Sequence, residues 1–145
     1  MYKHLAVAYE EGHPESKRAF QHALAVAKLL SQPLKVLTIA EPLPAYAAFS
    51  AAADLSAMHT LEQDKSAYYE QWRGRVVDEG NAQGVEISAY LLEGNSVHAI
   101  TSFVAQHDID LLIVGLHKRA LRISSLWSTV YTLAQDLNCS VLGVH

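Results

Sequence analysis

The stretch "LLIVG" at 111–115 decides the fold, because four consecutive apolar residues followed by glycine are typical of a strand covered on both faces. A strand with one solvated face alternates polar and apolar residues instead. After Gly115 the chain continues into the basic, hydroxyl-rich stretch "LHKRALRISSLWST" at 116–129. This join predicts an internal strand of a parallel sheet that ends at a candidate anion site.

Strand-like and helix-like patterns alternate along the whole chain. Such alternation predicts right-handed βαβ units and an α/β fold with a parallel sheet. The stretch "AYAAFSAAADLSAM" at 45–58 is alanine-rich and is interpreted as a loop or irregular helix over one end of the sheet. The expected strands are 2–9, 34–40, 85–92, 111–115 and 141–144, and the expected helices are 14–30, 55–82, a helix over 97–104, and a last helix capped by Ser124 or Ser125 that carries Leu126, Val130, Leu133 and Leu137.

Two helices carry the clearest periodicity. The first begins at Pro14, which suits a first helical position, and repeats apolar residues every 3.6 positions until Ser31-Gln32-Pro33 ends it. The long helix at 55–82 is expected to bury one apolar face. Its members are Met58, Leu61, Tyr68, Trp72 and Val76.

Composition limits the classes of protein. The 145 residues suit one domain spanning 1–145, and 50% hydrophobic with 18% charged residues is a globular composition. A net charge of -4 argues against a nucleic-acid binder or a binder of acidic membranes. The absence of a long apolar run and of a signal-peptide pattern predicts a cytosolic protein. Cys139 is the single cysteine, so no internal disulfide is expected.

Open parallel sheets bind ligands at the carboxyl ends of their strands, where the strand order reverses. Two strand orders are common for such sheets. In the order 3-2-1-4-5 the crevice lies between the loop after Tyr9 and the loop after Gly115. Glu10 would then face the basic loop.

The loop after Gly115 has two interpretations. Lys118, Arg119 and Arg122 put three of the eleven basic residues within five positions, and His117 could hydrogen-bond a phosphate beside them. The alternative is a solvated loop in which serine and threonine only cap the next helix. No G-x-x-x-x-G-K-[ST], G-x-G-x-x-G or GxSxG pattern is present. The eight histidines show no metal-binding spacing, and scattered surface or capping roles are the simpler interpretation.

Three segments together resemble the universal stress protein family. They are "YKHLAVAYEEGHPESKRAF" at 2–20, "LLEGNSVHAITSFVAQHDIDLLIVGLH" at 91–117 and "NCSVLGV" at 138–144, in the family's order and covering nearly the whole chain. The resemblance implies a single doubly wound, Rossmann-like domain with a five-stranded parallel sheet in the order 3-2-1-4-5. It also implies a homodimer paired through the last strand, Val141 to Val144.

ATP-binding members carry glycine, two residues, glycine, nine residues, then glycine followed by serine or threonine. By resemblance Gly115 matches the first glycine and Thr129 the final hydroxyl, whereas Lys118 and Ser128 replace the other two glycines. The family's aspartate after the first strand corresponds to Glu10, and the residue that meets adenine corresponds to Ile39. The incomplete glycine pattern resembles the A-type branch, which is generally regarded as not binding ATP.

The first hypothesis is therefore a cytosolic, homodimeric universal stress protein of A-like type, a regulatory or protective module with a degenerate nucleotide site and no enzymatic activity. The alternative is an ATP or AMP sensor, with Mg²⁺ accompanying ATP. It would place Glu10 and Ile39 near the nucleoside and hold the phosphates with Gly115, His117, Lys118, Arg119, Ser128 and Thr129. Slow nucleotide hydrolysis is a third interpretation, for which no base or metal set is evident.

Overall fold

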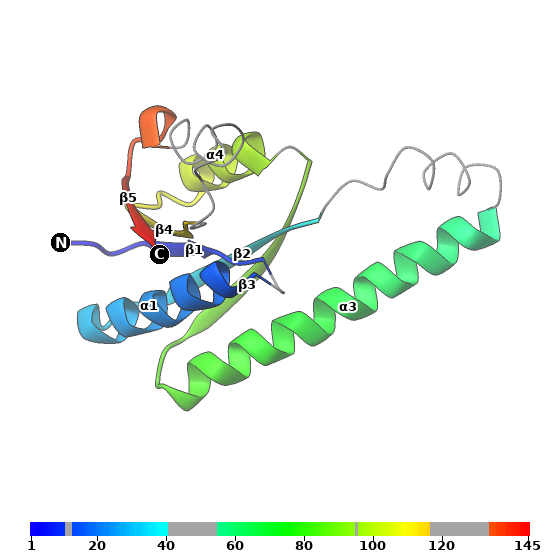
Figure 1. The fold of residues 1–145 in the computed structure, drawn as a ribbon, viewed down its shortest axis with the longest axis horizontal. Coiled ribbons are helices and arrows are strands. Elements are labelled where there is room, and N and C mark those ends of the chain that lie inside the picture. The colour runs from blue at the N-terminus through cyan, green and yellow to red at the C-terminus, as the bar shows by residue number, and fades with distance from the viewer. Residues whose placement is uncertain (11–12, 41–54, 95, 117–133) are drawn as a thin grey trace.

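The computed structural model describes residues 1–10, 13–40, 55–94, 96–116 and 134–145 (Figure 1). Strands and helices alternate within these ranges, as the sequence predicts. The strands are β1 (Leu5–Ala8), β2 (Leu34–Ala40), β3 (Ile87–Glu93), β4 (Leu111–Gly115) and β5 (Ser140–Val144), and the helices are α1 (Pro14–Leu30), α3 (Leu55–Ala82) and α4 (Ser96–Gln106).

All five strands form one parallel sheet in the order β3-β2-β1-β4-β5. This confirms the predicted doubly wound α/β architecture. Leu5 pairs with Leu34 on one side and with Leu111 on the other, so β1 is the central strand. Helices α1 and α3 lie on one side of the sheet and α4 lies on the other (Figure 1).

Strand β4 is buried on both faces, as its apolar run predicts. Leu111 and Ile113 belong to the core cluster on the side of α1 and α3. Leu112 and Val114 belong to the cluster on the side of α4. The alternation of side chains across a strand explains this division. Strand β4 therefore contributes residues to both cores.

Helix α1 begins at the predicted proline and ends at Ser31, which has φ 55 and ψ 44. Its predicted apolar face is buried against the sheet, with Leu30 packing at the edge of the cluster. A left-handed residue after a helix normally favours glycine, because a Cβ is strained there. Ser31 nevertheless donates its N–H to the Lys28 carbonyl at 3.2 Å, and this bond helps to close the last turn.

The bounds of α3 match the predicted 55–82, but its burial does not match the predicted face. Trp72 and Val76 are buried, whereas Tyr68 is 55% exposed, so this part of the prediction is wrong. The side chains of Met58 and Leu61 lie outside the described residues. Figure 1 gives the reason, because the amino-terminal half of α3 extends past the sheet. A periodic pattern shows which residues share a face, but it does not show how far a partner surface reaches.

Asp110 fastens the amino-terminal segment to the sheet. Its two carboxylate oxygens accept hydrogen bonds from the N–H groups of Lys3 and His4, at 2.8 and 3.0 Å. The Asp110 N–H in turn donates to the His4 carbonyl at 3.0 Å. Tyr2 adds a hydroxyl bond to Ser140 at 2.9 Å. The first strand is therefore anchored at its amino end to β4 and β5.

Some predicted features cannot be compared with the structure. Most of the 45–58 stretch and residues 124–133 of the expected last helix lie outside the described residues. Residues 134–136 are helical, and Leu137, which follows them, is buried on the α4 side. Among the described helices, none is long and apolar enough to cross a membrane.

Candidate functional site

The strand order places the topological switch point between β1 and β4. From β1 the sheet continues to β2 and β3 on one side and to β4 and β5 on the other. In such sheets the crevice for a ligand lies outside the carboxyl ends of the two strands that flank the reversal. Glu10, two residues beyond β1, and Gly115, the last residue of β4, therefore both lie at this edge.

The structure describes three of the eight predicted site residues. Glu10 is exposed and Gly115 is half-buried. Ile39, near the end of β2, pairs with Leu92 and packs partly buried on the α4 side. All three lie at the carboxyl edge of the sheet, on neighbouring strands. The other five lie outside the described residues: His117, Lys118, Arg119, Ser128 and Thr129.

Gly115 has a packing role that the sequence pattern did not reveal. A Cβ added at this position would lie 2.6 Å from the Glu15 carbonyl oxygen and 3.0 Å from the Ser16 nitrogen. Both atoms belong to the backbone of the first turn of α1, so they have little freedom to move away. Glycine therefore allows α1 to begin directly against the end of β4, whatever else the loop after it binds.

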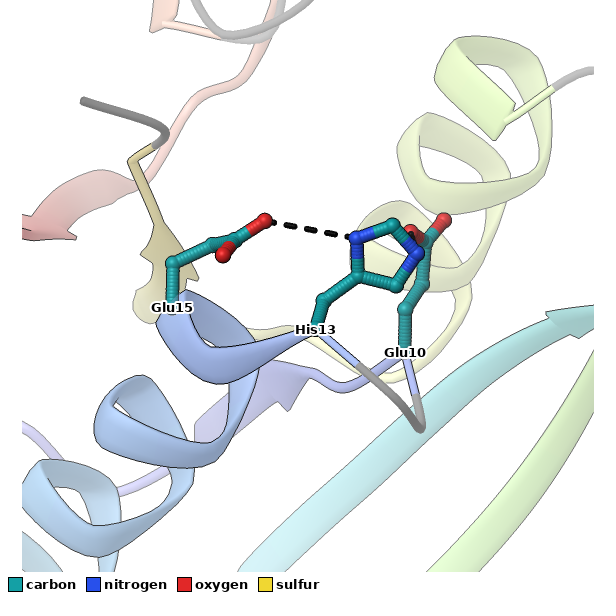
Figure 2. Close-up of polar contacts among 3 residues, drawn as sticks. All are labelled: Glu10, His13 and Glu15. Carbon is teal, nitrogen blue, oxygen red and sulfur yellow. Dashed lines mark ion pairs between the residues drawn. The ribbon is translucent and has the colours of Figure 1, made fainter. Parts of the chain in front are cut away.

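His13 lies between two carboxylates at the same edge (Figure 2). Its Nε2 is 3.6 Å from Glu10 Oε2, and its Nδ1 is 3.4 Å from Glu15 Oε1. His13 is also the N-cap residue of α1, although its side chain makes no capping hydrogen bond. Its backbone N–H donates to the Glu10 carbonyl at 3.3 Å.

Exposure differs sharply between the two carboxylates. The Glu10 side chain is 53% exposed and the Glu15 side chain only 12%. Glu15 lies in the first turn of α1, where the helix dipole favours negative charge. Sequence reasoning assigned Glu10 but missed His13 and Glu15. The three-residue spacing from Glu10 to His13 and the acidic first turn after Pro14 are the signals that could have identified them.

The described ranges hold no metal-binding cluster and one cysteine thiol. No group of three or more His, Cys, Asp or Glu side chains within them could hold a metal ion. Cys139 lies at the opposite, amino edge of the sheet. Burial raises the pKa of its thiol above the usual value. A hydrogen bond with the Leu112 backbone lowers the pKa, and the nearby Asp110 carboxylate raises it further. A raised pKa leaves little thiolate at neutral pH, so Cys139 is a poor nucleophile.

Solved structures share this fold. A universal stress protein from Archaeoglobus fulgidus is 16% identical over 100% of both chains, with a TM-score of 0.71. A universal stress protein in complex with cAMP is 22% identical, covering 99% of this chain and 97% of that one, with a TM-score of 0.67. A family protein from Arabidopsis thaliana with AMP bound is 16% identical, covering 97% and 90%, with a TM-score of 0.64.

At these identities the structural matches establish the fold alone. No curated protein matches the chain. The model of the universal stress protein family, however, matches residues 1–145. This match agrees with the strand order and with the three segments that resemble the family. The chain belongs to the universal stress protein family.

Proposed function

We propose that this protein is a non-enzymatic stress-response regulator that binds an adenine nucleotide between the carboxyl ends of β1 and β4. The observation that carries the proposal is the juxtaposition of Glu10 and Gly115 at the switch point. Parallel sheets bind ligands at this position, and structural neighbours are complexes with cAMP and with AMP. Family membership supports the regulatory role.

In this proposal the nucleoside lies near Glu10 and Ile39. The phosphates are held by Gly115, His117, Lys118, Arg119, Ser128 and Thr129, and Mg²⁺ accompanies ATP when ATP binds. Lys118 and Ser128 replace two glycines of the ATP signature, so basic side chains take over part of the role of close backbone contacts. We therefore expect a site that binds more weakly than one with the full signature.

Calorimetric titration with AMP and with Mg-ATP tests the proposal, together with analysis of nucleotide carried through purification. We expect micromolar binding that Thr129→Ala weakens at least about ten-fold, because a hydroxyl donor to phosphate is lost. Thr101→Ala is the matched control. The Thr101 hydroxyl bonds the Val97 carbonyl within α4 at 2.7 Å, so its removal should leave affinity unchanged. The absence of both binding heat and co-purified nucleotide would contradict nucleotide binding. It would favour a non-binding regulatory module of A-like type.

We also propose that the chain is one cytosolic domain that forms homodimers through Val141 to Val144. Support comes from β5, which is an edge strand of the sheet and exposes 39% of Leu142. An edge strand with an exposed apolar residue favours pairing with another chain. Sedimentation velocity at micromolar concentration should give a dimer, and Leu142→Lys should shift it toward monomer. A monomeric wild-type protein would refute this assembly.

A further inference from the structure

The indole of Trp72 carries a buried hydrogen-bond donor without an acceptor. Trp72 belongs to the core cluster on the side of α1 and α3, and it is only 2% exposed. Its Nε1 is buried, and no acceptor among the described residues lies within hydrogen-bond distance of it. The core on this side of the sheet therefore contains a polar group whose partner does not come from the described chain.

An unpartnered indole N–H is costly. The group only donates, and it cannot escape the cost of burial by changing its protonation state. A buried donor that forms no bond loses its hydration without compensation. The large majority of buried side-chain polar atoms in folded proteins are therefore bonded to the protein or to an ordered water, and buried tryptophan normally follows this rule.

The aromatic rings around Trp72 are widely spaced. The ring centroids of Tyr9 and Trp72 are 6.2 Å apart and the rings are inclined by 49°, while Tyr69 lies 5.8 Å from Trp72. On the other side of the sheet, Phe103 and His107 stack at 3.9 Å with an inclination of 18°. The inclined pair of Tyr9 and Trp72 leaves the rings apart on one side, which is where a small molecule fits.

The chemistry of the cluster selects the kind of molecule. Tyr69 contributes a hydroxyl that donates to the Ala89 carbonyl at 3.1 Å, and a phenolic oxygen that donates once also accepts. A charged ligand would lose its hydration among these rings, and an apolar one would leave Nε1 unsatisfied. A water molecule accepts from Nε1 and donates to oxygen atoms, and internal waters typically make about three such bonds.

We propose that Trp72 binds an internal water through Nε1, between α3, the Tyr9 ring and the sheet. The site lies within the core and is independent of nucleotide binding. The competing arrangement needs no ligand, because the N–H would point at the face of the Tyr9 ring in a weak N–H···π contact. The two arrangements differ in what Nε1 contacts and in what the N–H contributes to stability.

A high-resolution crystal structure of the full chain tests the contact directly. We expect electron density for a water about 2.7–3.2 Å from Trp72 Nε1, the normal range for a hydrogen bond. If no density lies at that distance, or if Nε1 points at the face of the Tyr9 ring, the proposal is refuted.

The contribution to stability is tested by removing the N–H while keeping the shape of the ring. Trp127 is the other tryptophan of the chain, so a Trp127→Phe background leaves position 72 as the only site for tryptophan analogues. Benzothienylalanine has a sulfur in place of the indole N–H. Fluorotryptophan keeps the N–H and is the matched control.

We expect benzothienylalanine to lower the urea midpoint of unfolding by about 0.5 M, the shift for one lost hydrogen bond in a protein of this size. Fluorotryptophan should leave the midpoint unchanged. A midpoint that stays the same or rises with benzothienylalanine would overturn the proposal, because replacing an unpartnered N–H by an apolar atom costs nothing. Circular dichroism of each protein shows whether it keeps the parent fold.

Discussion

Replacing Gly115 by alanine should destabilise the protein through a single backbone contact. The added Cβ would lie 2.6 and 2.7 Å from the carbonyl oxygen and carbon of Glu15, and ordinary contact begins at 3.4 Å. The first turn of α1 must therefore move away by about 0.8 Å. No flexible side chain is available to absorb this displacement, because the contacted atoms are backbone atoms.

The cost of this movement falls on a closely packed interface. Ala19 and Ala23 of α1 are completely buried against the sheet, so a displacement opens gaps along the helix. Overpacking of this kind typically costs 1–3 kcal/mol, and we expect the free energy of unfolding to fall by about 2 kcal/mol. With a urea m-value of about 2 kcal/mol/M, the midpoint of unfolding should fall by about 1 M.

Gly74→Ala provides the matched control for urea unfolding followed by circular dichroism. Gly74 lies exposed in α3, and a Cβ there would meet nothing within 4 Å. Alanine in an exposed helix interior should raise stability by about 0.5–1 kcal/mol. The two substitutions are chemically identical and should act in opposite directions. A midpoint for Gly115→Ala at or above that of wild type would show that α1 does not rest on β4 as described.

Three further changes can be measured by the same approach. Ser31→Gly should raise the free energy of unfolding by about 0.5–1 kcal/mol, because it relieves the left-handed φ of 55 after α1; an unchanged urea midpoint would contradict that strain. Asp110→Ala should lower the free energy of unfolding by about 2 kcal/mol, because the N–H groups of Lys3 and His4 lose their charged acceptor. Stability equal to wild type would argue against these hydrogen bonds holding the amino-terminal segment. Burial raises the pKa of Cys139, so alkylation by iodoacetamide at pH 8 should be slower in the folded than in the urea-unfolded chain. For the same reason the free energy of unfolding should fall as the pH rises through the raised pKa of the thiol. Equal alkylation rates in the two states would refute the raised pKa.

The architecture could be predicted because its signals are local. The apolar run at 111–114 predicted a strand covered on both faces, and Pro14 with the periodic residues after it predicted α1. The strand order came from resemblance to a family, since pairing between distant strands leaves no mark in a single local pattern. Bounds of strands were less accurate, and Val85, expected at the start of the third strand, lies buried just before β3.

The candidate site was predicted less completely, for a geometric reason. Glu10 and Gly115 could be placed together because both follow strands that the fold brings side by side. His13 and Glu15 were missed because their importance depends on where the first turn of α1 lies relative to β4. That placement is possible because Gly115 has no Cβ. From the sequence pattern, this glycine was expected only to let the backbone approach an anion.

The uneven burial of α3 divides one continuous helix into parts that differ in local stability. Trp72 and Val76 hold its carboxyl-terminal half to the core, and the Tyr69 hydroxyl donates a hydrogen bond to the Ala89 carbonyl at 3.1 Å. Residues 63–68 are exposed, and the ion pair of Lys65 with Glu93 at 3.2 Å links this portion to β3. Opening these turns breaks no core contact, so they belong to the low-cost end of the protein's local unfolding equilibria. Local opening of residues 63–68 therefore leaves the packing of Trp72 and Val76 in place.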